Sequence, residues 1–207
     1  MNVNDLAQLL GNACYGFLTL NFAWGLYCVI AVLRRVKQLR FRSELEQSTF
    51  LDRLSQLLQQ GSHAQASELC ENDARALPQL AYTGLQHRHL KYEQMRQFLG
   101  ELLQRDVIAD LEHRVSWIAT VIRSGPLLGL FGTVLGMMAA FGRIGQGQKV
   151  EPSQIADEIA VALICTAMGL ATAIPFGYCL AAINVRVRML QESLSSALLR
   201  FLENFKP

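Results

Sequence analysis

Three long stretches of the chain contain neither a charged side chain nor a histidine. They run from Leu6 to Leu33, from Ser124 to Gly142 and from Ile159 to Val185. A helix needs roughly 20 apolar residues to cross a bilayer, and the helices of soluble domains seldom stay uncharged over that length. The pattern therefore predicts an all-α membrane protein with three transmembrane helices.

Helical patterning continues outside the second and third stretches, where apolar residues three and four positions apart form two stripes. The first stripe comprises Leu99, Leu103, Val107, Leu111, Val115, Ile118 and Ile122, and the second comprises Val187, Leu190, Leu194, Leu198, Phe201 and Phe205. Such spacing is typical of one face of an α-helix. We therefore expect both transmembrane helices to extend well beyond the membrane. Their apolar faces then need partners, either each other or copies of the same protein.

The polar region between the first two stretches is also helical in pattern. One apolar stripe in it comprises Phe50, Leu51, Leu54, Leu57 and Leu58. Gly61 is expected to end this helix, and Ser62 can cap a second helix that runs to about Ala76. Pro78 can open a third helix, because proline suits the first turn.

Lysine and arginine gather beside one end of the predicted membrane helices. The segment "RRVKQLRFR" (34–42) follows the first stretch, and "VRVR" (185–188) follows the third. The loop between the second and third stretches holds only Arg143 and Lys149, against three acidic residues. Because basic residues favour the cytoplasmic side, we expect a periplasmic N-terminus and a cytoplasmic C-terminus in a bacterial inner membrane.

These observations divide the chain into six segments. They are an outer tail with the first transmembrane helix (1–33), a cytoplasmic helical region (34–123), the second transmembrane helix (124–142), a short outer loop (143–158), the third transmembrane helix (159–185) and a cytoplasmic C-terminal helix (186–207).

Small residues in the second transmembrane helix recur on one narrow face. They are Gly125, Gly129, Gly132, Gly136 and Ala140. Small side chains at this spacing let two helix backbones approach closely in a membrane. The sequence therefore predicts a helix-packing face, with the hydroxyl of Thr133 at its edge.

The third transmembrane helix carries a thin, weakly polar face that starts from Thr166. The same face holds Ala162, Ala173, Gly177 and, near the cytoplasmic end, Asn184. We interpret the two threonines and Asn184 as candidates for an ion pathway. The alternative is that each threonine only bonds the backbone of its own helix, and the sequence leaves this open.

The composition narrows the function classes. The chain is 51% hydrophobic and has a net charge of +2. No nucleophile–base pair, metal-ligand spacing or phosphate-binding loop is present, so we expect no enzyme, no catalytic residue, no cofactor and no metal site. We also expect no nucleic-acid partner. The predicted membrane helices carry no ionisable Asp, Glu, Lys, Arg or His, so a titrating group for proton transport would have to come from another polypeptide.

The segments "GPLLGLFGTVLGM" (125–137) and "IAVALICTAMGLATAIPF" (159–176), with Asn184 beyond them, resemble the ExbB/TolQ/MotA proton-channel family. The three-helix layout resembles its ExbB/TolQ branch. The resemblance implies a homopentamer around two transmembrane helices of an ExbD/TolR-like single-span partner, which supplies a membrane aspartate. Thr133 and Thr166 match the two pore threonines of that family.

One position departs from the family pattern. ExbB-type sequences commonly have glutamate where this chain has Val161. Glu158 lies one helical turn nearer the outer surface and is a candidate substitute at the outer mouth. It and Asp157 are also expected in the early turns of the third helix, where the helix dipole favours negative charge.

The resemblance implies a channel or stator subunit of a motor that the proton-motive force drives and that energises an outer-membrane or envelope process. The alternative is a non-conducting oligomeric membrane scaffold that uses the glycine face only to assemble. The sequence leaves open whether the machine is of TonB, Tol or gliding type, and whether the ion is a proton or sodium.

Overall fold

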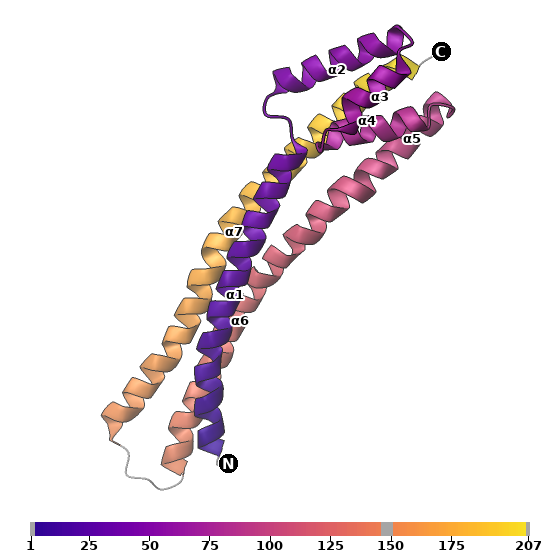
Figure 1. Ribbon diagram of the computed structural model, residues 1–207. Helices are drawn as coiled ribbons and strands as arrows, with labels where there is room; N and C mark the ends of the chain where they lie inside the picture. The colour runs from indigo at the N-terminus through magenta and orange to yellow at the C-terminus, as the bar shows by residue number, and fades with distance from the viewer. Residues whose placement is uncertain (1–2, 146–150, 206–207) are drawn as a thin grey trace. The chain divides into compact units, whose positions relative to one another are not determined.

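A computed structural model describes residues 3–145 and 151–205, and every regular element in this part of the chain is helical (Figure 1). The long helices are α1 (Val3–Leu39), α6 (Ala109–Gly145) and α7 (Pro152–Leu202). The shorter helices are α2 (Glu44–Gln59), α3 (His63–Glu71), α4 (Ala76–Gln86), α5 (Tyr92–Leu102), the π-helical η1 (Leu103–Ile108) and the 3₁₀ turn η2 (Glu203–Phe205). Within the described residues, three helical segments are long and apolar enough to cross a membrane, which agrees with the predicted number.

The chain forms two compact units, and the long helices contribute to both. We call Met1–Ile30 with Val115–Ala182 the span unit, and Ala31–Arg114 with Ile183–Pro207 the distal unit. Each is described by itself.

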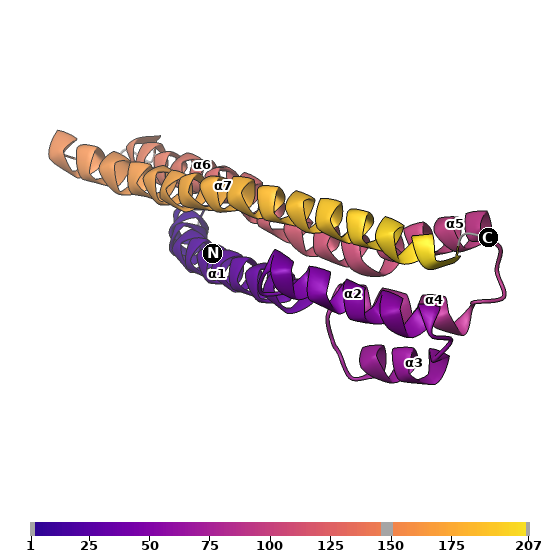
Figure 2. The same ribbon diagram turned by 90° about the horizontal axis from the view of Figure 1, so that it is seen from above.

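The span unit depends on a close approach of α6 and α7, which lie side by side (Figure 2). A Cβ atom added to Gly129 would lie 2.7 Å from the carbonyl oxygen of Cys165, and one added to Gly136 would lie 2.5 Å from the Cβ of Ala162. A Cβ on Gly169 of α7 would lie 2.5 Å from the carbonyl oxygen of Gly125. The two backbones therefore touch where both helices carry small residues.

Helix α1 packs against this pair. A Cβ added to Gly25 would lie 2.7 Å from the side chain of Val121 on α6 and 2.9 Å from that of Phe176 on α7. Large apolar side chains on the outer faces of the unit are exposed, among them Phe17, Leu127, Phe131, Leu163 and Ile174. Lipid or further membrane helices can cover such faces, whereas water cannot do so favourably.

In the distal unit, short helices pack on the last turns of α7. Helix α3 contacts both α2 and α4 (Figure 2). Gln47 on α2 donates to the backbone oxygen of Ser193 at 3.3 Å and accepts from its hydroxyl at 3.0 Å. Asp52 pairs with Arg200 at 2.6 Å. These contacts fix α2 along α7.

The two apolar stripes predicted outside the membrane lie largely in the core of this chain. Leu99, Leu103 and Leu111 are buried, as are Leu190, Leu194, Leu198 and Phe201. A Cβ on Gly84 of α4 would lie 3.1 Å from the ring of Phe201 and 3.4 Å from Leu99. The stripes therefore find partners within one chain, which was one of the two possibilities that the sequence left open.

Gly61 ends α2 as predicted. It has φ +72°, a conformation that favours glycine. Its backbone N–H donates to the carbonyl oxygen of Leu58 at 3.0 Å, and the backbone N–H of Ser62 donates to the carbonyl oxygen of Leu57 at 3.0 Å. This pair of bonds is the Schellman arrangement of a helix C-terminus.

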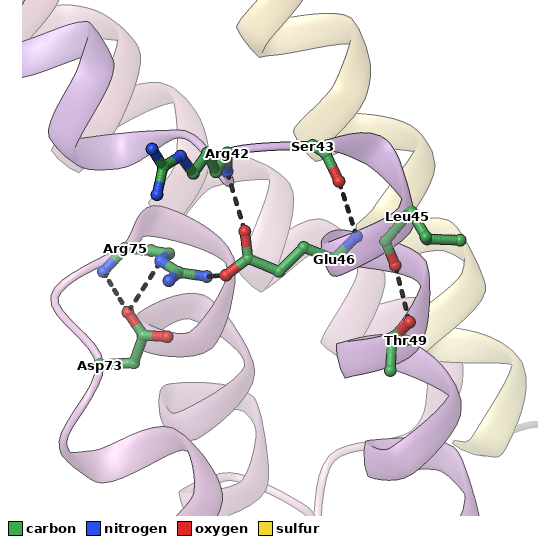
Figure 3. Close-up of polar contacts among 7 residues, drawn as sticks. All are labelled: Arg42, Ser43, Leu45, Glu46, Thr49, Asp73 and Arg75. Carbon is green, nitrogen blue, oxygen red and sulfur yellow. Dashed lines mark hydrogen bonds and ion pairs between the residues drawn. The ribbon is translucent and has the colours of Figure 1, made fainter.

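The helix after Gly61 is shorter than expected, because α3 ends at Glu71 instead of near Ala76. The side chain of Asp73 accepts from the backbone N–H of Arg75 at 3.0 Å, which makes a turn in place of further helix. The Arg75 guanidinium pairs with Glu46 of α2 at 2.7 Å (Figure 3). Pro78 lies in the first turn of α4, where we expected it.

The α6–α7 contact generates a test by substitution. Gly129→Ala places a methyl group against backbone, so it should destabilise the protein by about 1–3 kcal/mol. Gly16→Ala is the matched control, since a Cβ at Gly16 of α1 would meet nothing within 4 Å. This change should leave stability unchanged or raise it, because alanine favours helix over glycine. Thermal unfolding of the detergent-purified variants measures both, and equal midpoints would contradict the packing.

Candidate functional site

The two threonines predicted for the ion pathway differ in their hydrogen bonding. Thr133 on α6 is 6% exposed, and its hydroxyl donates to the backbone oxygen of Leu130 at 2.7 Å. Its polar group is therefore satisfied within its own helix. For Thr133 the structure agrees with the alternative in which the threonine bonds its own backbone.

Thr166 on α7 is different. Its hydroxyl oxygen is buried and has no hydrogen-bond partner among the residues that the structure describes. The facing residue on α6 is Gly129, whose added Cβ would lie 2.9 Å from the Cα of Thr166. A glycine offers this hydroxyl no side-chain partner. Leaving a buried hydroxyl unsatisfied costs about 1–3 kcal/mol, so stability alone does not explain a threonine at this position.

Thr172, which sequence reasoning did not single out, provides a comparison on the same helix. It is 7% exposed, and its hydroxyl donates to Met168 at 3.0 Å. It therefore behaves as Thr133 does. Within the described span unit, Thr166 is the threonine whose buried hydroxyl makes no hydrogen bond.

The remaining members of the weakly polar face of α7 differ in exposure. Ala162 and Ala173 are buried in the span unit. Asn184 belongs to the distal unit, where its side chain is exposed. The structure thus brings Thr166 and Ala162 against α6, but it does not place Asn184 in that contact.

Sequence reasoning also missed two polar residues of α1. The Asn21 amide nitrogen donates to the backbone oxygen of Val121 at 3.3 Å, and its oxygen accepts from the Ser124 hydroxyl at 2.9 Å. The Tyr15 hydroxyl donates to the backbone oxygen of Val161 at 2.9 Å. An amide within an apolar helix is costly unless it is bonded, and that is the signal that could have marked Asn21.

At the other candidate position, Glu158 forms an ion pair with Arg143 from the end of α6. Both side chains are about one third exposed or less. Helix α7 begins at Pro152, and its first turn holds no acidic residue, so Glu158 lies beyond the turn where the helix dipole acts most strongly. The arginine is therefore its main stabilising partner. Val161, where the family commonly has glutamate, is 53% exposed.

The ion pair predicts an asymmetry between two neighbouring acids. Glu158→Gln leaves Arg143 without its carboxylate and should lower stability by up to about 1 kcal/mol, as for a partly exposed pair. Asp157→Asn should change it little, since Asp157 is exposed. In a double-mutant cycle, Glu158→Gln in an Arg143→Gln background should cost nothing further. Additive losses in thermal unfolding would show that the pair does not stabilise the contact between the end of α6 and the start of α7.

Several known proteins are similar to this chain. It is 40% identical over 85 residues to the Tol-Pal system protein TolQ of Haemophilus influenzae, which is 41% of this chain and 37% of the relative. It is 31% identical over 130 residues to the biopolymer transport protein ExbB of Pseudomonas putida, which is 59% of this chain and 40% of the relative. The TolQ of Pseudomonas aeruginosa is 45% identical over 65 residues, which is 31% of this chain and 28% of the relative. The chain thus spans at most 40% of the length of these relatives.

The family comparison covers both glycine-rich α6 and the threonine-bearing part of α7. The sequence matches the MotA/TolQ/ExbB proton channel family over residues 72–196. This match includes both motifs that carry the resemblance, and three apolar helices identify a multi-pass membrane protein. Because the matched region is more than half of its 207 residues, the chain belongs to the MotA/TolQ/ExbB proton channel family.

Proposed function

We propose that this protein is the channel subunit of an inner-membrane motor driven by the proton-motive force, and that it energises an envelope process together with an ExbD/TolR-like partner. The observation that carries this proposal is the buried hydroxyl of Thr166, which has no hydrogen-bond partner among the described residues. It lies in a helix whose apolar stretch contains no Asp, Glu, His, Lys or Arg. Family membership supports the same function. The N-terminus lies on the periplasmic side in this proposal, since the basic segments flank the opposite ends of the spans.

The predicted transmembrane segments of this chain contain no Asp, Glu, His, Lys or Arg, which are the usual proton carriers within a membrane. The carboxylate must therefore come from the partner, as the resemblance to ExbB and TolQ implies. Thr166 then offers a hydroxyl that can donate to or accept from that carboxylate or from water beside it. Each proton that crosses releases roughly 2.3 kcal/mol per 100 mV of potential.

Assembly completes the site in this proposal. Five copies would surround two transmembrane helices of the partner, and the exposed apolar faces of the span unit leave room for such neighbours. The scaffold alternative has less support, since the glycine stripe that was to assemble it packs against α7 of the same chain. TonB-type, Tol-type and gliding-type machines all remain compatible with this subunit.

Thr166→Val tests the hydroxyl directly, because valine keeps the shape and removes the unsatisfied group. Thermal stability should stay the same or rise, while proton-driven function falls about tenfold, the equivalent of one hydrogen bond. Thr172→Val is the matched control on the same helix, because its hydroxyl is bonded to Met168. Complementation of a strain that lacks the protein, at matched expression, measures both. Equal function in the two variants would remove the basis for a Thr166 pathway.

Partner dependence is a separate test. Liposomes that contain this protein alone should show no proton flux above background under an imposed pH gradient and potential, because the titrating group is missing. Liposomes that contain the complex co-purified from its native host should show flux, and an Asp→Asn change in the membrane segment of the co-purified protein should abolish it. Flux from this protein alone would overturn the shared-site mechanism.

A further inference from the structure

A large pocket in the distal unit is lined almost entirely by cationic and apolar side chains. Its volume is about 970 Å³, and most of its wall comes from the end of α1 and the residues just after it. Its cationic residues are Arg34, Lys37, Arg40, Arg42, Arg75 and Arg186. No acidic side chain of the described residues lines it. We call it the basic pocket.

Most of this charge is unneutralised. Arg75 is paired with Glu46 at 2.7 Å and with Asp73 at 3.6 Å, and its guanidinium lies 4.4 Å from the centre of the Phe41 ring. The other five cations of the basic pocket make no ion pair within the described part of the chain. Figure 3 shows the Arg42 guanidinium turned away from Glu46, which instead accepts from the Arg42 backbone N–H at 3.1 Å.

Other arginines of the distal unit are paired with a carboxylate of this chain. Arg35, adjacent to Arg34 in the sequence, pairs with Asp110 at 3.2 Å, and Arg114 pairs with the same aspartate at 3.0 Å. Five of the six cations that line the pocket thus lack a carboxylate partner in the described chain, although Arg35 beside them has one. Like charges gathered in this way repel one another unless an anion joins them.

The position of the basic pocket along the chain points to the source of the anion. Arg34 is the first charged residue after the uncharged stretch of α1, and Arg186 is the first after that of α7. Both therefore lie where an apolar helix leaves the hydrocarbon layer, at the level of lipid headgroups. Leu33, Val36 and Phe41 give the basic pocket an apolar wall as well. A cationic site with an apolar wall at this level suits an amphipathic anion.

We propose that the basic pocket binds the phosphate headgroup of an anionic phospholipid from the adjoining leaflet. Arginine guanidinium groups bind phosphate oxygens in bidentate fashion, and Lys37 adds a point charge. The bound lipid neutralises the cluster and anchors the end of α1 at the membrane surface. Juxtamembrane basic clusters attract anionic lipids by this electrostatic mechanism.

The test uses the full chain, purified in a mild non-ionic detergent, stripped of lipid and titrated in native mass spectrometry. Phosphatidylglycerol and phosphatidylcholine with identical acyl chains are the two ligands. Lys37→Gln/Arg186→Gln removes two pocket charges, and Arg53→Gln/Arg188→Gln is the control with the same net charge and no residue in the pocket. Affinity for phosphatidylglycerol should fall about fivefold per pocket charge, or about 25-fold for the pair, and less than about twofold in the control.

Four comparisons distinguish a headgroup site from a diffuse charge effect and from a site for a soluble ligand. Lys37→Arg/Arg186→Lys keeps the charge and should retain most of the binding, which guards against a merely misfolded glutamine variant. Equal weakening in pocket and control variants would show that only overall surface charge matters, and equal binding of phosphatidylcholine would exclude anion recognition. Full displacement of the lipid by millimolar sn-glycerol 3-phosphate would show a site for a soluble phosphate ester. Any of these last three results overturns the proposal.

Discussion

The contact between the backbones of α6 and α7 is the constraint on which the span unit depends. Gly129, Gly136 and Gly169 leave no space for a Cβ atom, so the two helix backbones approach each other closely. In a membrane, close packing of this kind replaces the hydrophobic effect as the force that holds helices together. Thr166 lies at this contact, with its Cα against Gly129, and its buried hydroxyl has no hydrogen-bond partner among the described residues.

Local patterns in the sequence predicted the parts of this fold that depend on local physics. The three apolar helices follow from uncharged stretches, and the end of α2 follows from Gly61, because a left-handed residue at that point favours glycine. The end of α3 was not predictable in the same way. It depends on Asp73 capping a turn that Glu46 of another helix stabilises through Arg75. Such a contact joins residues far apart in the sequence and leaves no periodic signal.

At the candidate site, too, the sequence predicts some features, and others depend on the packing. Thr133 and Thr166 look equivalent in the sequence, since each lies beside small residues in an uncharged helix. Only the packing distinguishes them, because Thr133 reaches the carbonyl of Leu130 and Thr166 bonds nothing in the described chain. Likewise, Asn21 could be recognised as an expensive amide, but its partners Val121 and Ser124 could not be named without the fold.

The charged residues that flank the apolar stretch of α7 at its two ends differ in their ion pairing. Before the stretch, Glu158 forms an ion pair with Arg143 from the end of α6. After the stretch, Arg186 has no carboxylate in the described chain and shares its pocket with four other unpaired cations. Elsewhere in the distal unit the chain neutralises an arginine with its own carboxylate, as Asp110 does for Arg35. Because it does not do so here, the counter-charge is best supplied from outside the chain, and the membrane surface is the nearest reservoir of anions.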